Sequence, residues 1–292
     1  MNRVYIEISN ACNLSCSFCP SPSIKGLRQW MSLELFEETL DSLNGIVNEV
    51  YLHVLGEPLL HPQLDEFIQA CAHRALRVNL TTNGLLIAKQ AHMLLESKAL
   101  RQINFSLHAL QELPHPAEAQ IGLENSMTFL KLAMTLRPDL YINLRLWNEG
   151  HTQSEELAAW NRGVRQHIEQ ALDLKIPERP FTPRKKNYCL GGRAFLHSDT
   201  RFEWPADSQQ AEARPRGTCK ALKTHCAILA DGRIVACCLD YQGDLELGHV
   251  LNGGVEKALH SPRAQAMRAG FARNELVEPF CQHCQFCKRF GS

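Results

Sequence analysis

Apolar and polar positions follow two regular periods along most of the chain, and these periods predict strands and helices in alternation. The first apolar run, Val4 to Ile8, has the length of a short buried strand. Apolar positions within residues 33–43 then recur at the 3.6-residue spacing of a helix. Ser32 stands where it can cap the start of this helix, and Gly45 stands just past its end. The chain is therefore predicted to open with a strand followed by a helix.

The same alternation continues to about residue 204 and predicts parallel strands joined by crossover helices. Further strands are predicted at Glu49 to Leu55, Leu76 to Leu80, Gln102 to Leu107, Leu140 to Leu146 and Arg193 to Trp204. Further helices are predicted from Pro62 to Cys71, Leu86 to Leu95, Ile121 to Leu136 and Ser154 to Ala171, and a loop is predicted over residues 177–192. Because no dinucleotide-binding glycine pattern is present, we expect an α/β fold of the partial (β/α)6, TIM-like barrel type rather than a doubly wound sheet.

The charge balance narrows the classes of partner. Thirty-one Lys and Arg residues equal thirty-one Asp and Glu residues, so the formal net charge is zero. Proteins that bind nucleic acid or an anionic membrane usually carry a basic surface, and none is indicated here. The apolar stretch over residues 50–60 is interrupted by polar residues, Gly and Pro, and falls far short of the roughly 18 residues of a membrane-spanning helix. With no signal core at its start, the chain is expected to be a soluble cytoplasmic protein.

Twelve cysteines are the unusual feature of the composition. A reducing cytoplasm does not support a disulfide framework, so metal or cluster ligation is the natural alternative. The thiols gather mainly in two groups. The first group is Cys12, Cys16 and Cys19, and the second is Cys219, Cys226, Cys237, Cys238, Cys281, Cys284 and Cys287. Two thiol-rich sites are therefore expected on either side of a thiol-poor body.

The first group lies in the segment CNLSCSFC, directly after the first predicted strand, where barrel enzymes place their chemistry. Three thiolates leave one position open on a zinc ion or a [4Fe–4S] cluster. The CxxxCxxC spacing, with an aromatic residue before the last cysteine, resembles the signature of the radical S-adenosylmethionine (radical SAM) superfamily. The resemblance implies that Cys12, Cys16 and Cys19 hold a [4Fe–4S] cluster whose open iron binds S-adenosyl-L-methionine (SAM), and that SAM is cleaved to a 5′-deoxyadenosyl radical. A zinc knuckle with a distant fourth ligand is the alternative.

Further positions resemble the same family in order along the chain. The segment Leu55 to Pro58 resembles its GGE motif, and Thr81 to Gly84 resembles its TTNG motif. The resemblance implies SAM contacts from Gly56, Glu57, Asn83, Ser106, His108 and Arg145. Four of these positions also have a plainer interpretation: an Asn-Gly turn at Asn83, strand-end polarity at Ser106 and His108, and a surface salt bridge at Arg145.

The second group of thiols surrounds a hairpin signal. The segment AILADGRIVAC has two strand-like runs around Asp231 and Gly232, which predicts a two-residue type I′ turn. Residues equidistant from such a turn pair with each other, so Cys226 is expected to lie opposite Cys237. This register would allow both thiols to serve one site.

A resemblance gives a different ligand set for this second site. The pattern from Cys219 through Gly232 to Cys237 resembles the opening of SPASM and twitch domains, which follow many radical SAM barrels. Cys281 and Cys284 supply the closing CxxC. The resemblance implies one auxiliary [4Fe–4S] cluster on Cys219, Cys237, Cys281 and Cys284, with Cys226, Cys238 and Cys287 as possible substitutes. A structural zinc held by four thiolates is the alternative.

The resemblance as a whole implies a radical SAM core over residues 1–205 and an auxiliary cluster domain over residues 206–292. It implies a radical SAM oxidoreductase of the maturase type that oxidatively modifies its substrate, with a peptide or protein side chain preferred over a small metabolite. A reductant such as flavodoxin or ferredoxin would supply electrons, and no nucleic-acid or membrane partner is expected. A non-catalytic, zinc-stapled interaction protein is the competing hypothesis.

Overall fold

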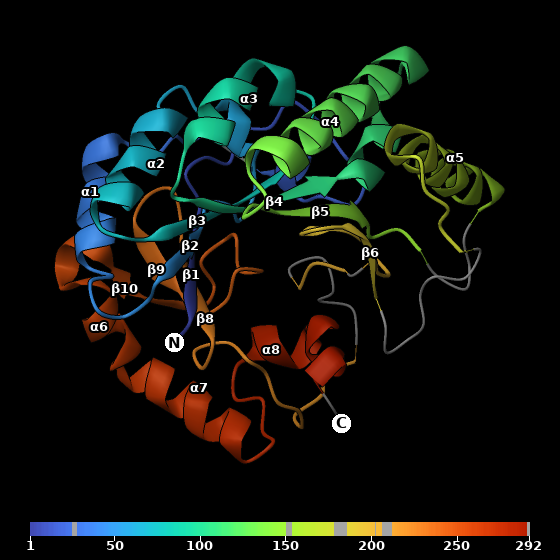
Figure 1. Ribbon diagram of the computed structural model, residues 1–292. Coiled ribbons are helices and arrows are strands. Elements are labelled where there is room, and N and C mark those ends of the chain that lie inside the picture. Colours follow the sequence, from blue (N-terminus) through green and yellow to red (C-terminus); the bar gives the residue numbers. More distant parts are fainter. Residues whose placement is uncertain (25–27, 150–153, 178–185, 202, 206–211, 291–292) are drawn as a thin grey trace. The chain divides into compact units, whose positions relative to one another are not determined.

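A computed structural model describes the chain except for residues 25–27, 150–153, 178–185, 202, 206–211 and 291–292 (Figure 1). The chain forms two compact units. The first is Met1–Asn13, Ser17–Val78 and Phe202–Ser292, and the second is Leu14–Cys16 and Asn79–Arg201. The strand β3 (Arg77–Thr82) contains the change from one unit to the other. The expected domain boundary after residue 205 adjoins residues outside the described part and stays a prediction.

The strands of the first unit are built around β1 (Arg3–Ile6). On one side β1 pairs in parallel with β2 (Glu49–Tyr51), and on the other side in parallel with β8 (His225–Ile228). The chain then continues antiparallel through β9 (Arg233–Val235) and β10 (Glu246–His249), which gives the order β10-β9-β8-β1-β2. Figure 1 shows the carboxyl-terminal hairpin, in orange, beside the amino-terminal strand, in blue. Residues more than 200 positions apart thus share one sheet.

Two helices of the first unit bear out the predicted period. The Ser32 side chain accepts a hydrogen bond from Leu35 N (3.2 Å) and caps α1 (Leu33–Asp41), as predicted. α1 packs against α2 (Leu64–His73) through the stacked rings of Phe36 and Phe67, whose centroids are 4.2 Å apart. The prediction that Pro62 begins the second helix is wrong. Pro62 lies in a turn instead, because His61 Nδ1 accepts a hydrogen bond from Gln63 N (3.2 Å).

The remaining helical elements of the first unit range from single 3-10 turns to a helix of 11 residues. They are η1 (Ser21–Ser23), η2 (Pro58–Leu60), η4 (Val250–Asn252), α6 (Gly254–Leu259), α7 (Pro262–Ala272), α8 (Pro279–His283) and η5 (Phe286–Phe290). β2 also is shorter than the predicted strand Glu49 to Leu55, since His53 N bonds back to Tyr51 O (2.8 Å) and turns the chain out of the sheet.

The second unit also has parallel strands covered by helices. β4 (Leu100–Ser106), β5 (Tyr141–Leu146) and β7 (Ala194–Ser198) pair in parallel in that order. The helices are α3 (Ile87–Glu96), α4 (Pro116–Leu136) and α5 (Glu155–Leu172), and a 3-10 turn η3 (Leu107–Glu112) follows β4. The alternation of strands and helices confirms the predicted mixed α/β class with parallel strands.

Two predicted boundaries in the second unit are wrong. Part of the predicted loop over residues 177–192 forms the strand β6 (Asn187–Gly191), antiparallel to β7. Gly192, at a φ of +52°, and Arg193 make the tight turn between these strands, and the predicted sixth strand ends early, at Ser198. None of the helices in the described part of the chain combines the length and the apolar composition that crossing a membrane requires.

Candidate functional site

The amino-terminal thiols lie in the segment between β1 and α1. Cys16 is buried, and Cys12 and Cys19 are partly exposed. Cys12 and Cys19 belong to the first unit, whereas the segment Leu14–Cys16 belongs to the second. Their joint ligation of one cluster stays a prediction.

Gly56 has a conformation and a position that only glycine fits. Its φ is +76°, and a Cβ added there would overlap the carbonyl oxygen of Ser9 and lie 2.9 Å from that of Ala11. The next residue, Glu57, donates its backbone N–H to Ala11 O (2.8 Å), and its buried carboxylate accepts from Leu59 N (3.0 Å). The segment of Gly56 and Glu57 is therefore held directly against the backbone that leads to Cys12.

Ser106, His108 and Arg145 come together at one end of β4 and β5 in the second unit. Ser106 is the register partner of Arg145, and His108 Nδ1 lies 3.2 Å from Arg145 O. Burial lowers the pKa of His108 to about 4, so its ring is neutral near pH 7. The Arg145 guanidinium stacks on Trp147 at 4.5 Å from the ring centroid, and Trp147 Nε1 donates to His197 Nδ1 (2.7 Å). This end of the sheet thus carries a cation beside neutral donors and acceptors.

Asn83 makes the turn that its Asn-Gly dipeptide indicates. Its side-chain Oδ1 accepts from Leu85 N (3.0 Å), and Gly84, at a φ of +86°, donates to Thr82 Oγ1 (3.0 Å). SAM contacts from Asn83 and from the residues above stay predictions, although strand ends are where parallel α/β folds bind ligands.

The first unit gathers the four thiols assigned to an auxiliary cluster and adds a fifth, Cys287. Burial, and then the nearby Cys237, raise the pKa of Cys219 to about 12. Burial, Cys237 and Cys219 likewise raise the pKa of Cys281. A hydrogen bond with Cys287, together with burial, raises the pKa of Cys284. Grouped thiols cannot all ionise without a compensating cation, and iron or zinc supplies one. The donor set therefore fits a thiolate-ligated metal centre.

Cys287 has its own supporting contacts. Its Sγ accepts a hydrogen bond from Arg214 Nη2 (3.2 Å) and lies 3.0 Å from Cys284 O. The same arginine donates to Cys284 O (2.9 Å), which ties η5 to α8. Of the surplus thiols, Cys287 is thus one that the fold brings to the auxiliary group.

The hairpin register differs by one residue from the prediction. Ala227 pairs with Val235, and the loop at Gly232 (φ +88°) has three residues instead of two. A shift of one residue moves every side chain to the opposite face. The fully buried Cys226 therefore does not lie opposite Cys237, and the prediction that it does is wrong. His225 takes that place.

His225, Cys237 and Cys238 offer ligand atoms within 4.8 Å of one another. Cys238 also packs with Tyr5 and Val54 against the apolar cluster around Ala227. Sequence reasoning missed His225 because its place depends on the register. The loop beyond these thiols is fixed by Asp240, whose buried carboxylate accepts from three backbone N–H groups, at residues 243–245.

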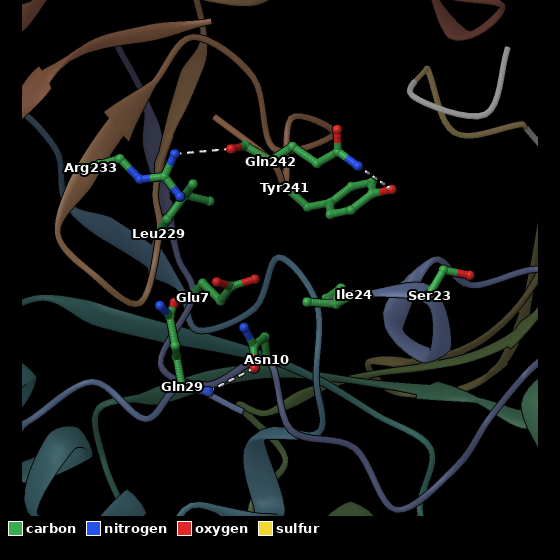
Figure 2. Close-up of a pocket in the computed structure, with 9 residues that line it drawn as sticks. All are labelled: Glu7, Asn10, Ser23, Ile24, Gln29, Leu229, Arg233, Tyr241 and Gln242. Atoms are coloured by element: carbon green, nitrogen blue, oxygen red, sulfur yellow. Dashed lines mark hydrogen bonds between the residues drawn. The ribbon is translucent and has the colours of Figure 1, made fainter. Parts of the chain in front are cut away.

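A polar cavity of about 430 Å³ opens beside the end of β1 (Figure 2). Its lining residues, all in the first unit, are Glu7, Asn10, Ser23, Ile24, Gln29, Leu229, Arg233, Tyr241 and Gln242. In Figure 2, Arg233 and Tyr241 lie on one side of the opening, and Asn10 and Gln29 lie on the other. Arg233 donates to Gln242 O (2.9 Å), and Gln29 N donates to Asn10 Oδ1 (2.9 Å). The lining therefore contains both hydrogen-bond donors and hydrogen-bond acceptors.

Glu7 is the buried ionisable group of this cavity. Its two carboxylate oxygens accept from Leu55 N and from Ala230 N, both at 3.3 Å. Burial raises the pKa of Glu7 to about 7; Asp231 raises it too, and Arg233 lowers it. Sequence reasoning missed this residue, although a carboxylate at a strand end five positions before Cys12 was an available signal.

Two family models match the chain. The model of the radical SAM superfamily matches residues 6–144, and that of an iron–sulfur cluster-binding domain, SPASM, matches residues 219–285. The fold and the thiol-rich sites thus define an iron–sulfur protein with a parallel α/β core. The chain belongs to the radical SAM superfamily and carries a SPASM domain. Membership implies a SAM-binding [4Fe–4S] cluster and auxiliary iron–sulfur ligation.

Curated relatives match part of the chain. The tungsten-containing aldehyde ferredoxin oxidoreductase cofactor-modifying protein of Pyrococcus furiosus is 24% identical over 199 residues, which are 64% of this chain and 54% of that protein. The GTP 3′,8-cyclase of Nostoc sp. is 33% identical over 135 residues, which are 42% of this chain and 39% of the cyclase. The chain thus matches about half or less of the length of these relatives.

Solved structures share the fold over nearly the whole chain. The structure of anSMEcpe with bound AdoMet and Cp18Cys peptide has a TM-score of 0.59 at 12% identity and covers 99% of this chain and 94% of its own. Streptococcus suis SuiB bound to precursor peptide SuiA has a TM-score of 0.60 at 15% identity, with 97% and 70% covered. BtrN in complex with AdoMet and 2-DOIA has a TM-score of 0.55 at 14% identity, with 97% and 92% covered.

Proposed function

We propose that this chain is a radical SAM oxidoreductase that modifies a peptide or protein side chain. The observation that carries the proposal is the gathering of Cys219, Cys237, Cys281 and Cys284 in the first unit, in a chain that also carries the CxxxCxxC segment. A closed second cluster suits electron transfer rather than substrate binding. An open SAM-binding cluster and a closed auxiliary cluster in one chain together favour net oxidation of the substrate.

Residues of this chain would hold the first cluster and bind SAM. Cys12, Cys16 and Cys19 would hold the SAM-binding cluster. Gly56 and Glu57 would bring backbone groups to SAM, and Asn83, Ser106 and His108 would supply polar contacts. The Arg145 guanidinium would bind the carboxylate of SAM, since a planar cation suits a bidentate carboxylate contact. When bound, SAM and its cluster supply abstraction of a hydrogen atom, and the auxiliary cluster supplies an electron acceptor.

The cavity at Glu7 is the proposed place of the substrate side chain. Oxidation of a carbon that bears a hydroxyl, amine or thiol removes one hydrogen atom from carbon, one electron, and one proton from the heteroatom. Glu7 lines the cavity and would accept that proton as the new double bond forms. A base whose pKa lies close to the working pH is suited to such a transfer, and burial places that of Glu7 at about 7.

Two of the structural relatives named above were solved with peptides, which supports a peptide substrate over a small metabolite. The polar lining of the Glu7 cavity supports a hydrogen-bonding side chain rather than an apolar one. An electron carrier such as flavodoxin or ferredoxin is the proposed reductant.

Anaerobic purification tests the proposal. The expected result is a brown protein that contains iron and sulfide and forms 5′-deoxyadenosine from SAM after reduction. Cys16→Ala should abolish SAM cleavage, whereas Cys237→Ala should retain uncoupled cleavage and lose substrate oxidation. Stoichiometric zinc without 5′-deoxyadenosine would refute the proposal in favour of a zinc-stapled interaction protein.

A further inference from the structure

A second cavity, of about 480 Å³, opens beside Cys219 in the first unit. Phe271 and Phe290 give it an apolar floor, and Lys220, Lys223 and Arg268 give it three cations. Its described lining contains no acidic side chain. In a chain whose formal net charge is zero, three cations around one opening are a local concentration of positive charge.

Two of the three cations, Lys220 and Arg268, are held by defined contacts. Lys220 Nζ lies 5.2 Å from the centroid of the Phe290 ring. Arg268, on α7, donates from Nη2 to Leu259 O (2.6 Å), which holds its guanidinium against the end of α6. Lys220 and Lys223 are exposed, so their charges reach the solvent. Any partner that docks here meets an apolar centre with a cationic rim.

Cys219 links this surface to the proposed auxiliary cluster. Cys219 is half-buried, lines the cavity, and is a proposed ligand of the auxiliary cluster. Electron transfer between two docked proteins requires each redox centre to lie close to the interface between them. Such encounters use small interfaces whose association is guided by opposite charges.

We propose that the surface formed by Lys220, Lys223, Arg268, Phe271 and Phe290 docks a small acidic one-electron carrier protein that exchanges electrons with the auxiliary cluster through Cys219. This inference rests on the proposed function, since it needs that cluster. One electron passes between the carrier and the cluster, and no covalent bond forms or breaks. The cationic rim attracts the acidic partner, and the aromatic floor gives it a dry contact next to the ligand.

Stopped-flow kinetics with reduced flavodoxin as the probe test the surface. The full-length protein with Cys12, Cys16 and Cys19 replaced by alanine leaves the auxiliary cluster as the one reporter. For this protein, the second-order rate of cluster reduction should fall as salt is added. The double variant Lys220→Glu/Lys223→Glu should be at least about tenfold slower at low ionic strength, because steering by opposite charges raises association rates about 10- to 1,000-fold.

Controls separate docking from damage to the cluster. Reduction by dithionite, which needs no docking surface, should be the same in both proteins. Lys220→Arg/Lys223→Arg should keep the fast rate, because the charge is retained. The same reversal at Lys89 and Lys131, exposed on α3 and α4, should leave the flavodoxin rate unchanged.

A normal flavodoxin rate in the charge-reversed protein, with its cluster intact, would overturn the docking surface and leave the proposed function standing. Loss of substrate oxidation with that normal rate would assign the surface to an acidic substrate segment instead. A wild-type protein with no auxiliary iron and sulfide would refute the proposed function, and this inference with it.

Discussion

Replacing Glu7 by glutamine tests whether the first unit prefers a neutral side chain at the end of β1. Burial raises the pKa of Glu7 from 4.5 to about 7, so the folded chain binds this proton more tightly than the unfolded chain does. Stability from this group is therefore complete below about pH 4.5 and is lost as the pH rises through 7. At 1.36 kcal/mol per pH unit, ionised Glu7 costs the folded state about 3 kcal/mol above pH 7.

Glutamine avoids that cost but brings another. Glu7 accepts backbone hydrogen bonds at both carboxylate oxygens, from Leu55 and Ala230, and a glutamine side chain has only one acceptor oxygen. The unpaired N–H group costs about 1–2 kcal/mol at any pH. The variant should thus be less stable than wild type at pH 5 and as stable or more stable at pH 8. Between these pH values, the difference in unfolding free energy should change by about 2.5 kcal/mol.

Urea unfolding of both proteins at pH 5 and pH 8, under anaerobic conditions, measures this change. Glu38→Gln, on the exposed face of α1, is the matched control, and its effect should be the same at both pH values. If the effect of Glu7→Gln were also the same at both, burial would not raise the pKa of Glu7 toward 7. Its role as proton acceptor in the cavity would then lose its support.

Three further changes probe the fold around the sites. Gly56→Ala should lower iron content and SAM binding strongly, whereas Gly45→Ala, at a similar positive φ but with nothing within 4 Å of the new Cβ, should cost only about 1 kcal/mol in urea unfolding. Cys226→Ala should keep auxiliary iron and sulfide at wild-type levels, while Cys237→Ala should lose them; equal loss would contradict the hairpin register. Ser32→Ala should destabilise the chain by about 1 kcal/mol in the same unfolding assay, and no change would show that the cap hydrogen bond is replaced by water.

Much of the fold was accessible from local patterns. The helix α1 and its cap follow from apolar spacing and from Ser32, both of which act within a few residues. The strands β4 and β5 were predicted to within two residues, because a strand buried in a sheet leaves a continuous apolar run. The strand β6 was missed because its polar and glycine-containing sequence is held by pairing with β7 and not by its own propensity.

The register at Asp231 and Gly232 marks a limit of local reasoning. An Asp-Gly pair suits a two-residue turn, and a three-residue loop with Gly232 in the left-handed region satisfies the same preference. The two turns differ by one residue, and that difference exchanges Cys226 for His225 on the face of Cys237. Side-chain preferences at the turn do not distinguish them, whereas the packing of Cys226 in the core does.

By itself the sequence determined the order of strands and helices, the two thiol-rich segments and the family signature. These depend on backbone sterics, side-chain periodicity and ligand spacing, which act over short stretches of chain. Only the tertiary structure decided that β8 pairs with β1, that His225 faces Cys237 and that Glu7 is buried. The reason is long-range pairing, because the N–H groups that bind Glu7 come from residues 55 and 230. A local sequence pattern does not indicate which distant segments will bury a given side chain.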